Sequence, residues 1–380
     1  MKNAFQFHGR GGEYFGIWMV NILLTIVTLG LYSPWAHVRN KQYFYGNTEL
    51  GGERFEYLAT GKQIFLGRLI AGVLFVAYVS LSNSMPMVSF AIIAFMLLVF
   101  PWVVQRSLRF NAVMTRYRGV RFGFNGSVRD AYVNFFGKPL VAYFNLGLFA
   151  VGCVFVLRWV GADNPEQLRA AGWGLQVFGI VALIGFLMLA VRLYAWVKRG
   201  IDSYIHNGYH YGHQQFSAKL DASEYSKIYG RIALVNIAAL LLFVFLIGGA
   251  LFTGSSSVST GFLAYIGFFV LMIYVRAFAF SHVRNYTYAQ TYIGESGQYG
   301  FSSMVKTWAY TKLLLGNAFF MILTLGLATP LVKVAVAEFL AKNTAVSGDL
   351  EQMIASELAD KESGATADAL GDVFNLDIQF

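Results

Sequence analysis

The stretch Thr28-Leu-Gly-Leu-Tyr-Ser-Pro-Trp-Ala-His-Val-Arg-Asn-Lys-Gln-Tyr-Phe-Tyr-Gly-Asn-Thr48 decides how this chain is organised. It ends an uncharged apolar run, passes a Gly and Pro break, and then alternates aromatic rings with Arg and Lys. Two of its pieces recur: Ala36-His-Val-Arg-Asn40 returns as Ser281-His-Val-Arg-Asn285, and Thr28-Leu-Gly-Leu31 returns as Thr324-Leu-Gly-Leu327. Self-similarity of this kind predicts copies of one structural unit.

The composition is that of a membrane protein. The chain is 57% hydrophobic and 13% charged, whereas ordinary soluble domains are roughly 25% charged. Several uncharged runs are about as long as a helix must be to cross ~30 Å of hydrocarbon. No cleavable signal peptide is expected, because the first run is not led by a basic cluster and ends at Ser33-Pro-Trp without a small-residue cleavage site. The single Cys153 excludes a disulfide framework and a Cys-based metal site.

The repeated unit has a recognisable beginning and end. It begins with a short aromatic and Gly-containing segment typical of a turn or small hairpin, continues with outgoing and returning apolar helices, and ends at an Arg flanked by rings. The distance from that Arg to the next segment is 16, 16, 17 and 17 residues. The segments begin at Phe5, Phe55, Phe122, Phe216 and Phe301, and the closing residues are Arg39, Arg106, Arg199 and Arg284, with Ala335 in the fifth unit.

The spacing predicts an all-α polytopic membrane protein of six to eight transmembrane helices in about five repeats, with short hairpin-like cytoplasmic connections. The distance from Phe to the closing residue is 34, 51, 77, 68 and 34 residues, and two crossings need about 40. The three middle units therefore have room for two spans each. The terminal units either enter and turn back, with breaks at Gly30, Pro34, Gly326 and Pro330, or form one full span each, near residues 15–34 and 313–333.

Charge predicts the orientation and the domain boundary. Most Lys and Arg residues fall in the four Arg-bearing connections, so the positive-inside rule places these connections in the cytoplasm. With six spans, both termini are also cytoplasmic; with eight, both are outside. Residues 343–380 hold eight acids and one base. We therefore divide the chain into a repeat-built transmembrane domain, 1–345, and an acidic cytoplasmic tail, 346–380, that is expected to be partly disordered.

The aromatic and basic residues at the ends of the returning helices are the first candidate site. Tyr and Trp rings settle at the level of lipid headgroups, and Arg and Lys reach phosphates. These side chains therefore contact headgroups, or they line a vestibule for an anionic solute. The candidates are Trp35, His37, Arg39, Arg106, Arg199, His282 and Arg284.

Amides within the apolar helices are the second candidate site. An amide in hydrocarbon needs a hydrogen-bond partner, so these residues join helices, or they line a polar route across the membrane. They are Asn21, Asn145, Asn236 and Asn317.

Metal, cofactor and catalytic sites are not expected. His206, His210 and His213 would share one face of a continuous helix and could then bind a metal. Gly208 and Gly212 weaken that helix, and no carboxylate or Cys lies near in sequence, so surface or headgroup contact is favoured. No set of catalytic side chains can be assembled, which argues against an enzyme, and no cofactor is implied. Aromatic and basic residues beside apolar spans indicate lipid rather than nucleic acid.

Three stretches of the first unit resemble a known family. The run Glu13-Tyr-Phe-Gly-Ile-Trp, then Thr-Leu-Gly-Leu-Tyr-Ser-Pro-Trp-Ala-His-Val-Arg, then Tyr-Phe-Tyr-Gly-Asn-Thr is similar to the YjgN family of bacterial inner-membrane proteins. The resemblance covers about residues 3–345. It implies a multi-pass protein of the bacterial inner membrane, and it implies no substrate and no catalytic residue.

Two functions follow as hypotheses. The first is a channel or transporter-like protein for a small solute, built from repeats with broken terminal helices. The second is a non-transporting scaffold that binds anionic lipids or partner proteins through its basic aromatic connections. The expected partners are membrane lipids, anionic ones in particular. Self-association of the chain stays open, and the sequence identifies no partner protein.

Overall fold

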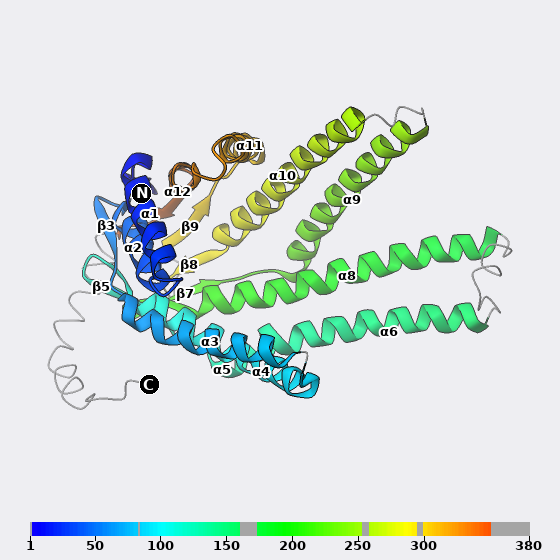
Figure 1. The fold of residues 1–380 in the computed structure, drawn as a ribbon, viewed down its shortest axis with the longest axis horizontal. Helices are drawn as coiled ribbons and strands as arrows, with labels where there is room; N and C mark the ends of the chain where they lie inside the picture. The colour runs from blue at the N-terminus through cyan, green and yellow to red at the C-terminus, as the bar shows by residue number, and fades with distance from the viewer. Residues whose placement is uncertain (1, 83, 160–172, 253–257, 295–298, 351–380) are drawn as a thin grey trace.

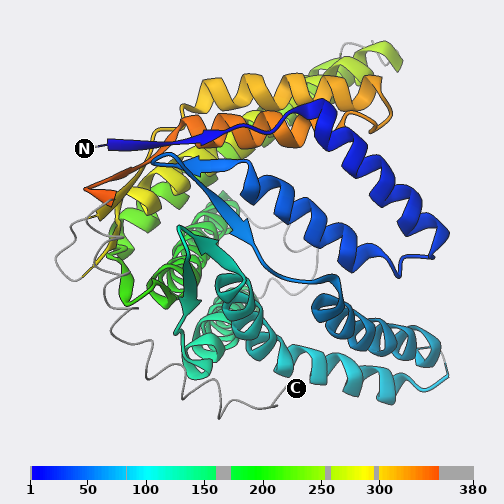
Figure 2. The same cartoon turned by 90° about the vertical axis from the view of Figure 1, so that its left-hand side faces the viewer.

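The computed structural model describes residues 2–82, 84–159, 173–252, 258–294 and 299–350. At one end lies a closed antiparallel barrel of ten short strands, and pairs of helices run away from it (Figures 1 and 2). The strands are β1 (Lys2–Phe7), β2 (Thr48–Leu50), β3 (Glu53–Tyr57), β4 (Thr115–Tyr117), β5 (Val120–Phe124), β6 (Tyr209–Tyr211), β7 (Gln214–Ala218), β8 (Thr291–Ile293), β9 (Tyr299–Ser303) and β10 (Thr344–Ser347).

The prediction of an all-α fold is therefore wrong. Four of the aromatic segments do fall in hairpins, β2–β3, β4–β5, β6–β7 and β8–β9, but these hairpins pair edge to edge instead of standing apart. The first strand pairs with the last, β1 with β10, and this pairing closes the barrel. The physical reason is that strands of three to six residues leave unpaired backbone groups at each edge, and closure satisfies every edge.

Two of the hairpin turns are dictated by residues that tolerate positive φ. Gly51 and Gly52 join β2 to β3 with φ of 55° and 84°, and Arg118 and Gly119 join β4 to β5 with φ of 46° and 80°. Two-residue turns with both φ values positive match the twist of the strands they connect. These turns set the register of their hairpins.

Each pair of helices is framed by two strands that bond to each other. In every unit the Phe of the first strand lies opposite an apolar or aromatic residue of the second. These cross-strand pairs are Phe5 with Leu50, Phe55 with Tyr117, Phe122 with Tyr211, Phe216 with Ile293, and Phe301 with Val346. The repeat that the sequence shows is thus a strand–helix–helix–strand unit, present five times around the barrel.

The helices of the three middle units are long. Within the described residues, six helical segments are long and apolar enough to cross a membrane: Gly61–Leu81, Pro86–Val113, Val128–Trp159, Trp173–Gly208, Ala222–Phe245 and Phe262–Ala289. They belong to α3 (Gly61–Leu81), α4 (Pro86–Val113), α5 (Val128–Tyr132) with the π-helix η1 (Val133–Gly137) and α6 (Lys138–Trp159), α8 (Trp173–Gly208), α9 (Ala222–Phe252) and α10 (Val258–Ala289).

The helices of the two terminal units are shorter and turn back. They are α1 (Gly11–Val27), α2 (Ser33–Gly46), α11 (Thr307–Leu323) and α12 (Thr329–Lys342). The 17 residues of α1 span about 25 Å at 1.5 Å per residue. Since both helices of each pair meet the barrel, the terminal units are helical hairpins. Their tips carry Leu29 and Leu325, each 93% exposed.

The repeated Thr-Leu-Gly-Leu motif forms the tips of both terminal hairpins. Leu29 and Leu325 have φ near 50°, and Gly30 and Gly326 both have φ of 91°. The hydroxyl of Thr28 accepts the backbone N–H of Tyr32 at 3.0 Å, and Thr324 accepts that of Ala328 at 2.9 Å. Pro34 and Pro330 lie in the first turn of the returning helices, where a missing N–H costs nothing.

A second repeated contact joins helix to strand. In four units a Thr begins the second strand, and its hydroxyl donates to the backbone carbonyl four residues earlier. That carbonyl belongs to the last turn of the returning helix. These bonds run from Thr48 to Phe44, Thr115 to Asn111, Thr291 to Thr287 and Thr344 to Leu340, at 2.7–2.8 Å. The end of each returning helix is thereby held at a fixed place on the barrel.

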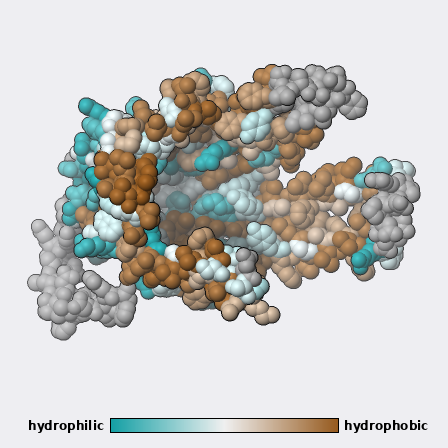
Figure 3. Space-filling model, viewed as in Figure 1, coloured by the Kyte–Doolittle hydropathy of each residue, from teal (hydrophilic) through white to brown (hydrophobic). Residues whose placement is uncertain are grey.

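Hydropathy separates the two parts of the molecule. Apolar side chains cover the helices that run away from the barrel, while hydrophilic residues gather at the barrel end and in the hollow between the helix pairs (Figure 3). The predicted tail lies, from residue 351 onward, outside the described residues.

Candidate functional site

The interior of the barrel is a packed core. The rings of Phe5, Phe55, Phe122, Phe216 and Phe301 follow one another around it, with neighbouring centroids 5.6–6.4 Å apart. Burial raises the pKa of Tyr117, which therefore stays protonated, and its hydroxyl donates to the Leu50 carbonyl at 2.5 Å. Leu350 also packs against this core. The barrel axis is filled by side chains, so the barrel acts as a frame for the helices.

The repeated Arg residues fall into two pairs with different surroundings. Arg39 and Arg106 are exposed, and Arg106 lies over the Trp102 ring at 5.7 Å. Arg199 and Arg284 are half-buried. Arg199 donates Nε–H to the Leu220 carbonyl at 2.7 Å.

Arg284 lies beneath the barrel. Its Nη2 donates to the Thr344 hydroxyl at 2.9 Å, and its guanidinium lies 4.2 Å from the Tyr288 ring centroid. It lines an aromatic cavity of about 390 Å³ that reaches Phe5 and Phe301. The four arginines therefore occupy equivalent places in the repeat without sharing one site.

The other aromatic and imidazole candidates pack locally. Trp35 lies against the backbone of Gly61 and the ring of Phe65. His37 is half-buried on α2, near Lys41 and Arg68. The Nδ1 of His282 lies 2.9 Å from the Phe278 carbonyl of its own helix.

The four helix amides have different partners. Asn21 is 3% exposed and donates Nδ2–H to Asn40 Oδ1 at 3.1 Å, across the α1–α2 hairpin. Asn145 and Asn236 donate to carbonyls of their own helices. In the part of the chain that the structure describes, the buried Nδ2 of Asn317 has no hydrogen-bond partner.

The three His residues do not share a continuous helix. Helix α8 ends at Gly208, His210 lies on β6, and His213 lies in the following turn. The Nδ1 of His206 lies 2.7 Å from the Asp202 carbonyl. Among the described residues, no group of three or more His, Cys, Asp or Glu is placed to hold a metal ion.

Two grooves on the outside of the helices have a basic end and an apolar length. The first, about 750 Å³, lies between the tip of the α1–α2 hairpin and α3. Arg68 donates to the Ser33 hydroxyl in it at 2.9 Å, and Leu69, Val73 and Val76 line its length.

The second groove, about 700 Å³, lies between α8 and α9. Arg192 and Lys227 lie at its barrel-proximal end, and Leu187, Leu234 and Ile237 line the remainder. Lys227 is already paired with Glu224 at 2.7 Å, so Arg192 is the cation available to a ligand. Both grooves offer a positive charge above an apolar wall.

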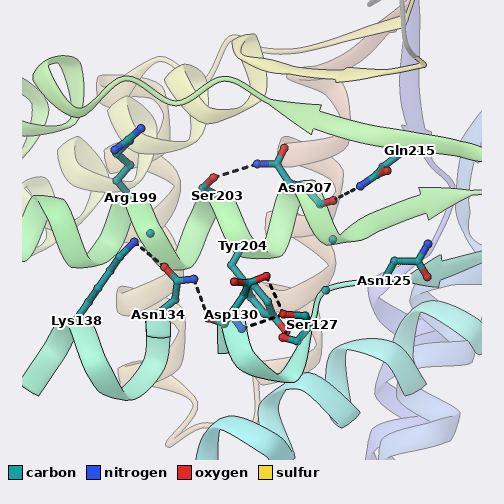
Figure 4. Close-up of a pocket in the computed structure, with 13 residues that line it drawn as sticks. Asn125, Ser127, Asp130, Asn134, Lys138, Arg199, Ser203, Tyr204, Asn207 and Gln215 are labelled. Atoms are coloured by element: carbon teal, nitrogen blue, oxygen red, sulfur yellow. Dashed lines mark hydrogen bonds between the residues drawn. The ribbon is translucent and has the colours of Figure 1, made fainter. Parts of the chain in front are cut away.

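A third cavity, of about 430 Å³, is lined mainly by polar side chains (Figure 4). The side chains of Arg199, Ser203 and Asn207 extend from one side of α8, and Asn134 and Lys138 lie on the opposite side of this helix (Figure 4). Lys138 donates to Asn134 Oδ1 at 2.7 Å. The cavity therefore joins one repeated Arg to residues from the start of the same unit.

Sequence reasoning missed Asn134 and Lys138. Their spacing of four residues is common in helices and carries no signal of its own. The distinguishing feature is the π-helix Val133–Gly137, which contains Asn134 and is directly followed by Lys138, and which has no recognisable sequence pattern. Arg68 and Arg192 are visible in the sequence as cations near span ends, but the grooves below them depend on which helices become neighbours.

Comparison with known proteins gives the family. A family of bacterial proteins of unknown function (DUF898) matches residues 2–373. The chain is 27% identical to inner membrane protein YjgN of Salmonella typhimurium (strain LT2), over 93% of this chain and 90% of that protein. It is 29% identical to inner membrane protein YjgN of Escherichia coli O157:H7, over the same shares. No solved structure matches the chain.

The family match and the helices agree with each other. The residues that match the family include the six membrane-length helices of the described part of the chain. The two relatives are named inner membrane proteins, and each is aligned with this chain over 90% of its length. The sequence resemblance and the predicted location are thereby confirmed. The chain belongs to the DUF898 family, it is similar to the YjgN proteins over most of its length, and it is a multi-pass protein of the bacterial inner membrane.

Proposed function

We propose that this protein is a membrane scaffold that binds anionic phospholipids in the two grooves on the outside of its helices. The observation that carries the proposal is the shared design of the two outer grooves. Each has an Arg at its barrel-proximal end, Arg68 or Arg192, and an apolar wall leading away from it. An anionic phospholipid has the same division between a charged headgroup and apolar chains.

The charge distribution supports the choice of an anionic lipid. Among the described residues, neither Arg68 nor Arg192 forms an ion pair with a carboxylate. A phosphate can therefore approach each guanidinium without displacing a protein partner. By the positive-inside rule we place the barrel in the cytoplasm, so both grooves face the leaflet where anionic headgroups attract basic residues. The proposal assigns no enzymatic activity.

A transporter for a small solute is the second candidate. The two terminal hairpins lie side by side, because α1 packs against α12. Asn21 and Asn317 bring buried amides to these hairpins, and Asn317 has an unused donor among the described residues. Broken helices that carry polar groups are typical of transporter binding sites. The packed barrel gives less support to this candidate than the grooves give to lipid binding.

The test is lipid affinity of the purified full chain. We expect Arg68→Gln and Arg192→Gln each to weaken binding of phosphatidylglycerol by about fivefold, since one basic residue near a headgroup contributes about 1 kcal/mol. Binding of phosphatidylcholine should change little. The control is Arg121→Gln, because Arg121 is exposed on the outside of the barrel. Native mass spectrometry or titration into lipid nanodiscs gives the affinities.

Equal loss of affinity in all three variants would show non-specific attraction to a basic protein, and no loss in any would show that the grooves do not hold headgroups. Either result would overturn the proposal. Solute flux in vesicles of the same lipid that is abolished by Asn317→Leu, with lipid affinity unchanged in the Arg variants, would favour the transporter instead.

A further inference from the structure

The polar cavity beside α8 differs from the two grooves because it has no apolar length for a lipid chain. Its lining residues come from the β5–α5 connection, from α5, η1 and α6, from the barrel-proximal end of α8 and from β7. We propose that this cavity binds a phosphate or a similar small oxyanion group, carried either by a free solute or by a lipid headgroup. The proposal does not rest on the two grooves.

Uncompensated positive charge is the first argument. Lys138 and Arg199 both line the cavity, and their like charges repel each other. Within the residues that the structure describes, neither forms an ion pair. Of the lining residues only Asp130 is acidic, so one carboxylate stands against the two cations and the lining keeps an excess of positive charge. An oxyanion bound beside Lys138 would offset this positive charge.

The second argument comes from the hydrogen bonds of the cavity wall, which use only some of the donors of Lys138 and Arg199. Asn134 donates to the Asp130 carbonyl at 2.8 Å and accepts from Lys138. Asn207 donates to Ser203 and accepts the Ala218 backbone N–H at 2.6 Å. The wall amides are thus held by protein partners. Lys138 uses one donor on Asn134 and its Nζ also lies 5.5 Å from the Trp196 ring centroid, and Arg199 uses its Nε–H on Leu220. Among the described residues, no hydrogen bond occupies the remaining N–H groups of these two side chains.

The backbone around Lys138 is the third argument. A Cβ at Gly200 would collide with Lys138 Nζ and Asn134 Oδ1, so only glycine lets these groups lie against α8. The π-helix widens the opposite wall by one residue, with Lys138 N–H bonded to the Val133 carbonyl, and such widened turns are frequent at functional sites. Charged donors held in fixed positions are what an oxyanion needs for short, strong hydrogen bonds.

The experiment measures phosphate binding by the purified full chain in detergent. Inorganic phosphate is titrated at constant ionic strength against chloride, and binding is followed by calorimetry and by the midpoint of thermal unfolding. We expect Lys138→Gln to weaken phosphate binding about tenfold, since a charge-assisted hydrogen bond is lost. Lys62→Gln is the matched control, because Lys62 is an exposed lysine at the start of α3, and it should bind phosphate as the wild type does.

A second variant keeps both charges. Gly200→Ala should also weaken phosphate binding, because the added methyl displaces Lys138 from its position. Unfolding of each variant in the absence of phosphate shows whether the fold is retained. The proposal fails if the wild type gains no stability from phosphate over chloride, or if Lys138→Gln binds phosphate as tightly as the wild type.

Competition identifies the source of the bound group. If phosphatidylglycerol in nanodiscs displaces inorganic phosphate and phosphatidylcholine does not, the cavity holds a lipid headgroup. If neither lipid competes, it holds a soluble anion. Both results support an oxyanion site. Loss of lipid affinity in the Arg68 and Arg192 variants with unchanged phosphate binding would separate this cavity from the grooves.

Discussion

The barrel and the membrane helices are stabilised in different ways. Each barrel strand is hydrogen-bonded on both sides, and its inward side chains pack in a common aromatic core. The helices instead expose large apolar side chains along their length, such as Phe90 at 74% and Phe155 at 70%. The comparison teaches that the barrel fixes the positions of the helix ends, while the helices depend on lipid to cover their surfaces.

The largest expected effect concerns the side of the membrane on which each of the two parts lies. In a Cys153→Ser background, we expect an impermeant maleimide added to intact cells to label Ser84→Cys, in the α3–α4 connection, and to leave Glu53→Cys on the barrel unlabelled. The reason is that most Lys and Arg residues lie in the connections that carry the barrel strands, which favours the cytoplasm for the barrel. Both positions should react after lysis. Labelling of Glu53→Cys in intact cells would reverse the orientation and remove the leaflet argument for the grooves.

The next largest effect is expected in the barrel core. Phe122 has ring neighbours in Tyr211 at 5.0 Å and in Phe55 and Phe216 at 6.4 Å. Phe122→Ala should lower the free energy of unfolding by about 3 kcal/mol, because a cavity remains in a closed core. The measurement is a denaturant or SDS titration of the purified protein.

The matched control for the core is a Phe on a membrane helix. Phe155→Ala, at a position that faces the surroundings, should change the free energy of unfolding by less than about 0.5 kcal/mol. Similar losses for the two substitutions would mean that the helices pack as tightly as the barrel, contrary to the comparison.

Sequence reasoning predicted the parts that are encoded locally. The returning motif Thr-Leu-Gly-Leu predicted the breaks at residues 28–31 and 324–327, because Gly at positive φ and a following Pro are local signals. The interval between each Arg and the next Phe predicted five units, and it corresponds in the structure to the end of one helix and two short strands.

The rest depends on contacts between distant residues. Closure of the barrel pairs Ala4 with Ala345, and no local pattern in strands of three to six residues indicates such a partner. The polar cavity likewise joins Lys138 to Arg199, 61 residues later, through a π-helix and a glycine that the sequence does not mark. Sequence reasoning singled out Arg199 as the residue that closes a returning helix, whereas it lies nine residues before the end of α8, and it could not show which side chains would lie near it.

The smallest predicted effect concerns the hydrogen bond that joins the two helices of the first terminal hairpin. Asn21→Leu removes the bond to Asn40 between α1 and α2, and an interhelical amide bond in a membrane contributes about 0.6–2 kcal/mol. We expect a loss of stability near the lower end of that range. The Oδ1 of Asn21 is buried without a partner among the described residues, so removing it offsets part of the cost.

The control is Asn145→Leu, because the Asn145 amide donates to the Val141 carbonyl of its own helix and faces the surroundings. This substitution should leave the free energy of unfolding unchanged or raise it. Equal losses in the two variants would mean that the α1–α2 hairpin is held by its apolar contacts and the barrel alone, and that the buried amide serves another purpose.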